Sequence, residues 1–213
     1  MRSWQRLAHA LCGQWNVVGA DLFSQPYKAT WGAGDLNSDW DAAAQRIGDH
    51  LLEQCPRWLI FVQGVGQLPG AGRIDSEGKG GDNLLDVGMF WGENIVGARK
   101  HPIRLSDPRR LVYSPATFGP STYSFPFFTY GKFPLNMPRI LDLKFDFVQY
   151  DLRSPITFAT LGDRFDTWQS QSWLKFVVKY CAERSYGFFV SSLGDDEDVG
   201  GLLRSDWTSP QTF

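Results

Sequence analysis

The chain has 213 residues, of which 43% are hydrophobic and 15% aromatic, enough to bury the core of one domain. Its formal net charge of −2 argues against nucleic acid or an anionic membrane as a partner. No segment approaches the ~20 apolar residues that a membrane-spanning helix requires.

The cysteines and the N-terminal residues argue against several further kinds of protein. Cys12, Cys55 and Cys181 are too few and too scattered for a disulfide scaffold or a structural zinc site. One pair is able to form a disulfide in an oxidising compartment, but the spacing does not identify the pair. Residues 1–15 carry basic side chains, but His9 interrupts their short apolar run, so no signal peptide is predicted there. No metal or organic cofactor is predicted.

The first half of the chain alternates strand and helix patterns. The run WNVVGADL at 15–22 predicts a buried strand, and apolar residues at helical spacing over 40–51 predict a helix. The run WLIFVQG at 58–64 predicts a second strand. A glycine-rich loop over 66–83 is expected to lead to a third strand, RLVYSPA at 110–116.

The second half continues the alternation. Proline and aromatic residues over 118–138 make regular structure unexpected there. A strand is predicted at 156–160, a helix at 168–181 and a last strand at 186–192. The apolar runs do not alternate with polar residues, which is typical of parallel strands buried on both faces. The pattern therefore predicts an α/β fold: part of a β/α barrel or a small doubly wound sheet.

Several stretches, taken in order, resemble glycoside hydrolase family 5, the cellulase family, and its endo-β-1,4-glucanase-like members in particular. Among them are WNVVGADLFSQPYKATWG, RWLIFVQGV, RLVYSPATFGPS and SPITFATLGDRF. They follow the order and spacing of the fourth to eighth βα units of that family's barrel, over most of residues 8–210. The resemblance implies a single domain over 1–213: an incomplete (β/α)8 TIM barrel of about five parallel strands, truncated at its N-terminal side.

Missing units would leave the sheet with two exposed edges, which a closed barrel does not have. Three explanations stay open at this point. The chain is an incomplete gene model, a true half-barrel with covered edges, or a chain that a partner completes. Members of the family are usually secreted, so the resemblance implies an extracellular location if the true start lies upstream of Met1. The location of the chain as it stands is left open.

The positions that would carry chemistry in this family have changed. Its members use two glutamates about 5 Å apart, one as acid/base and one as nucleophile. By the resemblance, the acid/base position is Gln25, which follows Ser24 where the family has asparagine, and the nucleophile position is Thr160. Gln63 takes the place of a further glutamate. Other family positions for substrate contacts are occupied by Ala116, Phe118 and Val190.

These replacements predict a loss of catalysis. An amide at position 25 has no proton to transfer, and loss of general acid catalysis typically costs about 10²–10⁴-fold in rate. Thr160 would need an adjacent base to act as a nucleophile, and the histidine expected nearby is Ala116. Two other acids, Asp21 and Asp163, and the acidic run at 195–198 are alternative carriers of activity. A solvated acidic loop is the simpler interpretation of the run.

Two tryptophans are candidates for retained sugar contacts. Trp31 and Trp91 follow predicted strands, on the side where the family binds substrate, and sugar rings stack on indoles. A role in packing is at least as common for such residues. The leading prediction is a catalytically inactive relative with weak binding to β-glucan or a related polysaccharide. The alternatives are an active endo-β-1,4-glucanase with displaced acids and a gene fragment without function.

Overall fold

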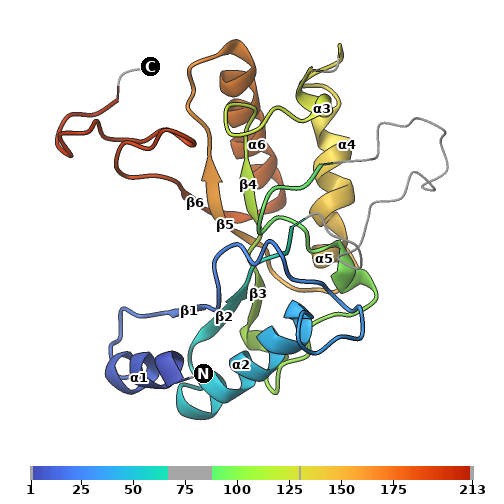
Figure 1. The fold of residues 1–213 in the computed structure, drawn as a ribbon, viewed down its shortest axis with the longest axis vertical. Helices are drawn as coiled ribbons and strands as arrows, with labels where there is room; N and C mark the ends of the chain where they lie inside the picture. The colour runs from blue at the N-terminus through green and yellow to red at the C-terminus, as the bar shows by residue number, and fades with distance from the viewer. Residues whose placement is uncertain (1, 67–87, 130, 212–213) are drawn as a thin grey trace.

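Six short parallel strands form the centre of the chain, which is described here from a computed structural model over residues 2–66, 88–129 and 131–211 (Figure 1). The glycine-rich loop expected over 66–83 lies, apart from its first residue, outside these residues. The strands are β1 (Gly19–Asp21), β2 (Leu59–Val62), β3 (Leu111–Tyr113), β4 (Ala116–Phe118), β5 (Thr157–Gly162) and β6 (Gly187–Val190).

The strands form two three-stranded sheets, ordered β1-β2-β3 and β4-β5-β6, and every pairing is parallel. The expected strand at 110–116 is divided between them. Ser114 N donates to Val62 O on the β2 side (2.8 Å), whereas Ala159 N on the β5 side donates to Pro115 O (3.1 Å). A parallel bridge between Tyr113 and Ile156 also joins the two sheets. β3 and β4 are thus two parts of one barrel strand, interrupted by Ser114 and Pro115, and the six segments fill five strand positions.

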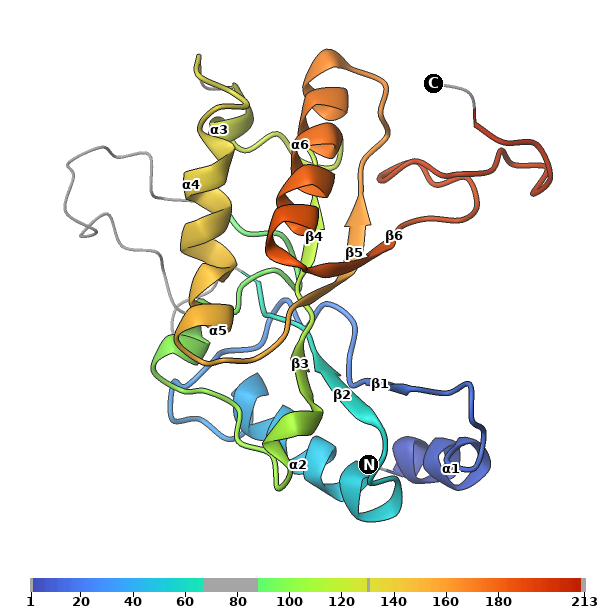
Figure 2. The same ribbon diagram turned by 180° about the vertical axis from the view of Figure 1, so that it is seen from behind.

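Helices cover the sheets on their outer sides (Figures 1 and 2). The two helices predicted from apolar periodicity are present as α2 and α6, in which the side chains of Leu51, Trp173 and Val177 are buried. The long helices are α1 (Arg2–Leu11), α2 (Trp40–Gln54) and α6 (Trp168–Arg184). Short 3-10 segments are η2 (Val96–Arg99) and η3 (Pro108–Arg110).

The expectation of no regular structure over 118–138 was wrong in part, because α3 (Pro126–Thr129) lies within it. A second helical stretch begins near its end and was not predicted. That stretch runs through α4 (Met137–Leu141), the π-helical η4 (Asp142–Asp146) and α5 (Phe147–Tyr150). Pro138 sits in the first turn of α4, where a missing N–H costs nothing and a fixed φ favours the helix.

A disulfide joins Cys12, just after α1, to Cys55, just after α2, with 5.6 Å between the Cα atoms. It identifies the pair that the sequence left open, and Cys181 is buried without a disulfide partner. Within the described ranges, no helix has the length and apolar character needed to cross a membrane.

Candidate functional site

Gln25 lies just beyond the carboxyl end of β1 and is fixed there by Gln63, which follows β2. Gln25 has a positive φ of 49°, and its backbone N–H donates to Gln63 Oε1 (2.9 Å). Gln63 in turn donates through Nε2 to Asp21 Oδ2 (2.8 Å) and is only 2% exposed. Lost hydration raises the pKa of the Asp21 carboxyl, and the hydrogen bond from Gln63 partly offsets the rise. The Gln63 amide therefore fixes the backbone at Gln25 and links it to Asp21.

Gly92 connects Gln25 to the next strands. Its carbonyl accepts from Gly64 N (2.8 Å) and from Ala116 N (3.1 Å), and a β-carbon at Gly92 would lie 3.2 Å from Gln25 Cα. Ala116 is in register with Thr160 on β5. Backbone contacts thus connect Gln25, just after β1, through Gly92 and Ala116 to Thr160, which lies within β5.

The substrate-side residues predicted on the middle strands are apolar and buried. Ala116 is 0% exposed and Phe118 6% exposed, and the Phe118 ring packs edge-on against Phe90 at 5.4 Å. Neither presents a polar group to a ligand. Val190, on the edge strand β6, and Ser24, beside Gln25, are both exposed.

Trp91 forms an exposed aromatic pair with Tyr27, from the loop after β1. The ring centroids are 4.5 Å apart, the planes are inclined by 27°, and the residues are 57% and 40% exposed. Lys28 Nζ lies 5.5 Å from the Tyr27 ring centroid. Tyr27 was not among the predicted site residues, because its partner is distant in sequence. Its position two residues after Gln25 is the only signal in the sequence by which it could have been found.

Trp31 does not belong to this surface. It is 1% exposed, its Nε1 donates to His101 O (2.9 Å), and its ring packs near that of Tyr113. A sugar ring has no access to a buried indole, so the interpretation of Trp31 as a sugar platform is corrected to a packing role.

A buried ion pair involves Glu93, two residues after Trp91. Lys144 Nζ donates to Glu93 Oε2 (2.8 Å), and the two side chains are 2% and 1% exposed. Thr117 Oγ1 donates to Glu93 Oε1 (2.8 Å) and Phe90 N to Glu93 Oε2 (2.9 Å). Burial lowers the pKa of Lys144, and the carboxylate of Glu93 opposes that shift. The pair ties the segment that carries Trp91 to β4 and to the π-helical turn.

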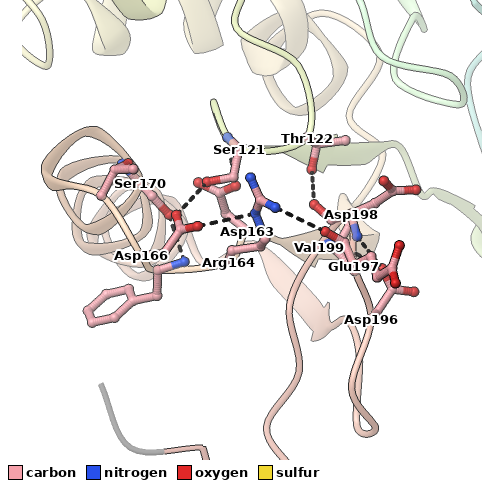
Figure 3. A network of polar contacts seen from close by, with 12 residues as sticks. Ser121, Thr122, Asp163, Arg164, Asp166, Ser170, Asp196, Glu197, Asp198 and Val199 are labelled. Atoms are coloured by element: carbon pink, nitrogen blue, oxygen red, sulfur yellow. Dashed lines mark hydrogen bonds and ion pairs between the residues drawn. The ribbon is translucent and has the colours of Figure 1, made fainter.

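Asp163, three residues beyond Thr160, is 7% exposed and faces the loop after β4 (Figure 3). Ser121 N donates to its Oδ1 (3.0 Å), and a β-carbon at Gly119 would collide with its carboxyl group. Burial raises the pKa of Asp163, and hydrogen bonds from Ser170 and Ser121 partly offset the rise. Its carboxyl group is therefore packed against residues 119–121.

Hydrogen bonds organise the acidic run at 195–198 (Figure 3). Asp196 Oδ1 accepts from the backbone N–H groups of Asp198 and Val199 at 2.9 and 3.0 Å. Arg164 and Thr122 donate to the backbone carbonyls of Glu197 and Asp198. In the part of the chain that the structure describes, no three metal-binding side chains come together.

A cavity of about 240 Å³ lies between the ends of β5 and β6, α6 and the segment 199–202. Leu174, Val190, Val199 and Leu202 are among its lining residues. Neither Tyr27 nor Trp91 lines this cavity, so it is distinct from the surface that they form. The two predicted catalytic positions do not line it either.

The chain was compared with known protein families and with curated proteins. The family model described as Cellulase (glycosyl hydrolase family 5) matches residues 1–195. An endoglucanase of Paenibacillus polymyxa is 34% identical over 97% of this chain and 50% of its own length. The major extracellular endoglucanase of Xanthomonas campestris is 30% identical over 91% of this chain and 38% of its own length. The chain thus spans half or less of these relatives.

Solved structures are similar in fold. A hyperthermophilic endocellulase from the archaeon Pyrococcus horikoshii superposes with a TM-score of 0.87 at 30% identity, over 99% of this chain and 59% of that chain. The catalytic domain of the major endoglucanase from Xanthomonas campestris gives a TM-score of 0.80 at 29% identity, with the same coverage. These neighbours support the prediction of a partial TIM barrel. By sequence and by fold, the chain belongs to glycosyl hydrolase family 5, the cellulase family.

Proposed function

We propose that this chain is a catalytically inactive member of the family that retains weak binding to β-glucan. The observation that carries the proposal is the pair of residues at the two catalytic positions, Gln25 and Thr160. Hydrolysis with retention needs one carboxylic acid to protonate the leaving oxygen and one carboxylate to attack the sugar. Neither an amide nor an unactivated hydroxyl performs these steps.

Asp21, which binds Gln63, and Glu93, which follows Gly92, are already engaged in other contacts. Asp21 accepts from Gln63, and Glu93 accepts from Lys144, Thr117 and the Phe90 backbone in a buried cluster. Glu93 forms an ion pair with the buried Lys144, so its carboxylate belongs to the packed interior. The hydrogen bonds of Asp21 and Glu93 therefore stabilise the fold, and neither carboxylate is placed to transfer a proton to a substrate.

The Tyr27–Trp91 pair supports the binding half of the proposal. The two rings present exposed faces beside Gln25, and aromatic faces stack on the apolar C–H faces of sugars. The Gln25 amide beside them is able to donate and accept hydrogen bonds with a sugar hydroxyl or a glycosidic oxygen. A Pyrococcus horikoshii endocellulase of similar fold has been solved with cellotetraose, which makes this tetrasaccharide a suitable probe.

Calorimetric titration with cellotetraose, alongside an assay of reducing ends from carboxymethyl-cellulose, tests the proposal. We expect measurable binding, weakened by Trp91→Ala and unchanged by Trp15→Ala. Trp15 is 88% exposed and precedes β1, at the opposite end of the strand from Gln25. We expect no release of reducing ends above the blank. Binding that Trp91→Ala leaves intact would contradict the assigned surface.

A second candidate function is an active endo-β-1,4-glucanase with a displaced acid. Asp163 favours it, because a buried carboxyl group with a raised pKa is what a general acid needs. Its packing against Gly119 and Ser121 counts against it. Under this alternative, turnover is present in the purified chain and is lost in Asp163→Asn.

A further inference from the structure

Trp91 sits in a tight turn that the side chain of Glu93 closes. Glu93 N donates to Phe90 O (3.1 Å), and Phe90 N donates in the other direction to Glu93 Oε2 (2.9 Å). Gly92, the residue after Trp91, has a φ of 79°, which suits glycine in the third position of a type II turn. Two hydrogen bonds between Phe90 and Glu93 thus fix the backbone on both sides of Trp91.

The carboxylate of Glu93 is itself held by two other elements. Thr117 Oγ1, on β4, donates to Glu93 Oε1, and Lys144 Nζ donates to Glu93 Oε2, both at 2.8 Å. The oxygen that Lys144 binds is also the oxygen that accepts from Phe90 N. The lysine therefore fixes the atom that closes the turn around Trp91.

Lys144 comes from the π-helical turn η4, between α4 and α5. Lys144 and Phe145 are the buried residues of this turn. Lys144 Nζ also lies 5.1 Å from the centroid of the Phe127 ring, within the range of a cation–π contact. Turns of this type are rare and occur frequently at functional sites. Here the turn carries an ammonium group that a carboxylate and an aromatic face hold in the interior.

A buried ion pair is an uncommon way to stabilise a core. The cost of removing two charges from water offsets much of their attraction, so apolar side chains of similar volume often give an equally stable fold. In some proteins, buried ionic groups are retained because their geometry selects one conformation. In this chain the ion pair holds the turn at 90–93. That turn presents Trp91, which is 57% exposed and stacks on Tyr27.

We propose that Lys144 is a positioning residue for the Tyr27–Trp91 surface, acting through Glu93 and the backbone of the turn. The lysine side chain is 2% exposed, so it has no access to a sugar and affects binding only through the residues that it holds. The inference rests on the proposed binding of β-glucan at this surface. The position of Trp91 is nevertheless measurable without any ligand.

Fluorine NMR of the full chain labelled with 5-fluorotryptophan tests the position of Trp91. The resonances that Trp91→Ala and Trp15→Ala remove identify these two residues among the nine tryptophans. The variant Glu93→Gln, Lys144→Met removes both charges, so no buried charge is left without a partner. We expect the Trp91 resonance to shift or broaden in this variant, because the turn is no longer tied to η4. The Trp15 resonance should stay unchanged.

Calorimetric titration with cellotetraose measures the consequence for binding. The variant Glu93→Gln, Lys144→Met should raise the dissociation constant about 3-fold, because a displaced ring loses part of its stacking contact. In a Trp91→Ala background the same two substitutions should cause no further change, since Lys144 acts through Trp91. Val177→Ala, at a buried position of α6, is the control for lost stability and should leave the affinity unchanged.

Three results would overturn the inference. The first is a Trp91 resonance that the variant Glu93→Gln, Lys144→Met leaves unchanged. The second is an equal loss of affinity with and without the Trp91 ring. The third is an equal loss in Val177→Ala, which would assign the effect to reduced stability. If the wild type does not bind cellotetraose, the proposed function fails, whereas the fluorine resonance still decides whether Lys144 positions Trp91.

Discussion

Tyr27 and Trp91 stack on one another at the carboxyl end of the strands, with ring centroids 4.5 Å apart. The loop after β1 supplies one ring, and a segment held by the Gly64–Gly92 backbone contact supplies the other. The pair lies beside Gln25, where the family resemblance places a catalytic glutamate. An exposed aromatic surface is thus present next to Gln25.

Removal of either ring should weaken binding to cellotetraose. Trp91→Ala and Tyr27→Ala are each expected to raise the dissociation constant about 3- to 10-fold, since an aromatic stacking contact contributes roughly 0.5–1.5 kcal/mol. Calorimetric titration measures the change. Trp15→Ala is the matched control, and an equal loss of affinity in that variant would assign the effect to something other than the Tyr27–Trp91 surface.

The buried pair of Glu93 and Lys144 should be sensitive to the loss of one partner. Glu93→Gln leaves a buried ammonium without a counter-charge and is expected to lower the free energy of unfolding by about 3–5 kcal/mol. The combined variant Glu93→Gln, Lys144→Met removes both charges and should recover most of the loss. Urea denaturation measures each value. Equal destabilisation in the single and double variants would show that the charge pairing is not the cause.

Asp163 should make stability depend on pH. Because burial raises its pKa in the folded state, the folded chain holds this proton more tightly than the unfolded chain does. Its contribution to stability is fully present below the ordinary value of 3.8 and is lost as pH rises through the raised folded value. Asp163→Asn should therefore be more stable than the wild type at pH 7, and the difference should shrink on acidification.

Thermal unfolding from pH 4 to pH 8 measures this difference. Asp198→Asn, in the exposed acidic run, is the control and should show no such trend. A stability difference between Asp163→Asn and the wild type that is constant across the range would contradict the assignment.

The disulfide between Cys12 and Cys55 should stabilise the fold by restricting the unfolded chain. For a sequence separation of 43 residues, reduction is expected to lower the free energy of unfolding by about 2–4 kcal/mol. Reductant should not change the stability of Cys12→Ser, Cys55→Ser, which serves as the control.

The sequence predicted those helices and strands whose apolar residues recur at a regular spacing. The spacing of apolar residues predicted the helices α2 and α6, and a run of apolar and β-branched residues predicted the strand β2. The structure contains all three elements. The helix that begins at Met137 was missed, because proline and aromatic residues dominate the stretch before it. Proline in the first turn was the available signal.

Those patterns do not predict contacts between residues that are far apart in the sequence. Glu93 and Lys144 are 51 residues apart, and neither position carries a motif that requires the other. The exposure of Trp91 and the burial of Trp31 depend on which way two similar loops turn, and both have Gly after Trp. The positions of Gln25 and Thr160 came from the family resemblance, and the strand register then brought Thr160 next to Ala116.

The release of reducing ends from a β-1,4-linked oligoglucan by the highly purified chain tests the central claim most directly. Wild type, Asp163→Asn and the Gln25→Ala, Thr160→Ala variant should all be measured. The absence of carboxylic acids at positions 25 and 160 predicts no release above the buffer blank in any of these samples. Turnover that co-purifies with the wild-type chain, and that a substitution in this chain abolishes, would contradict the claim.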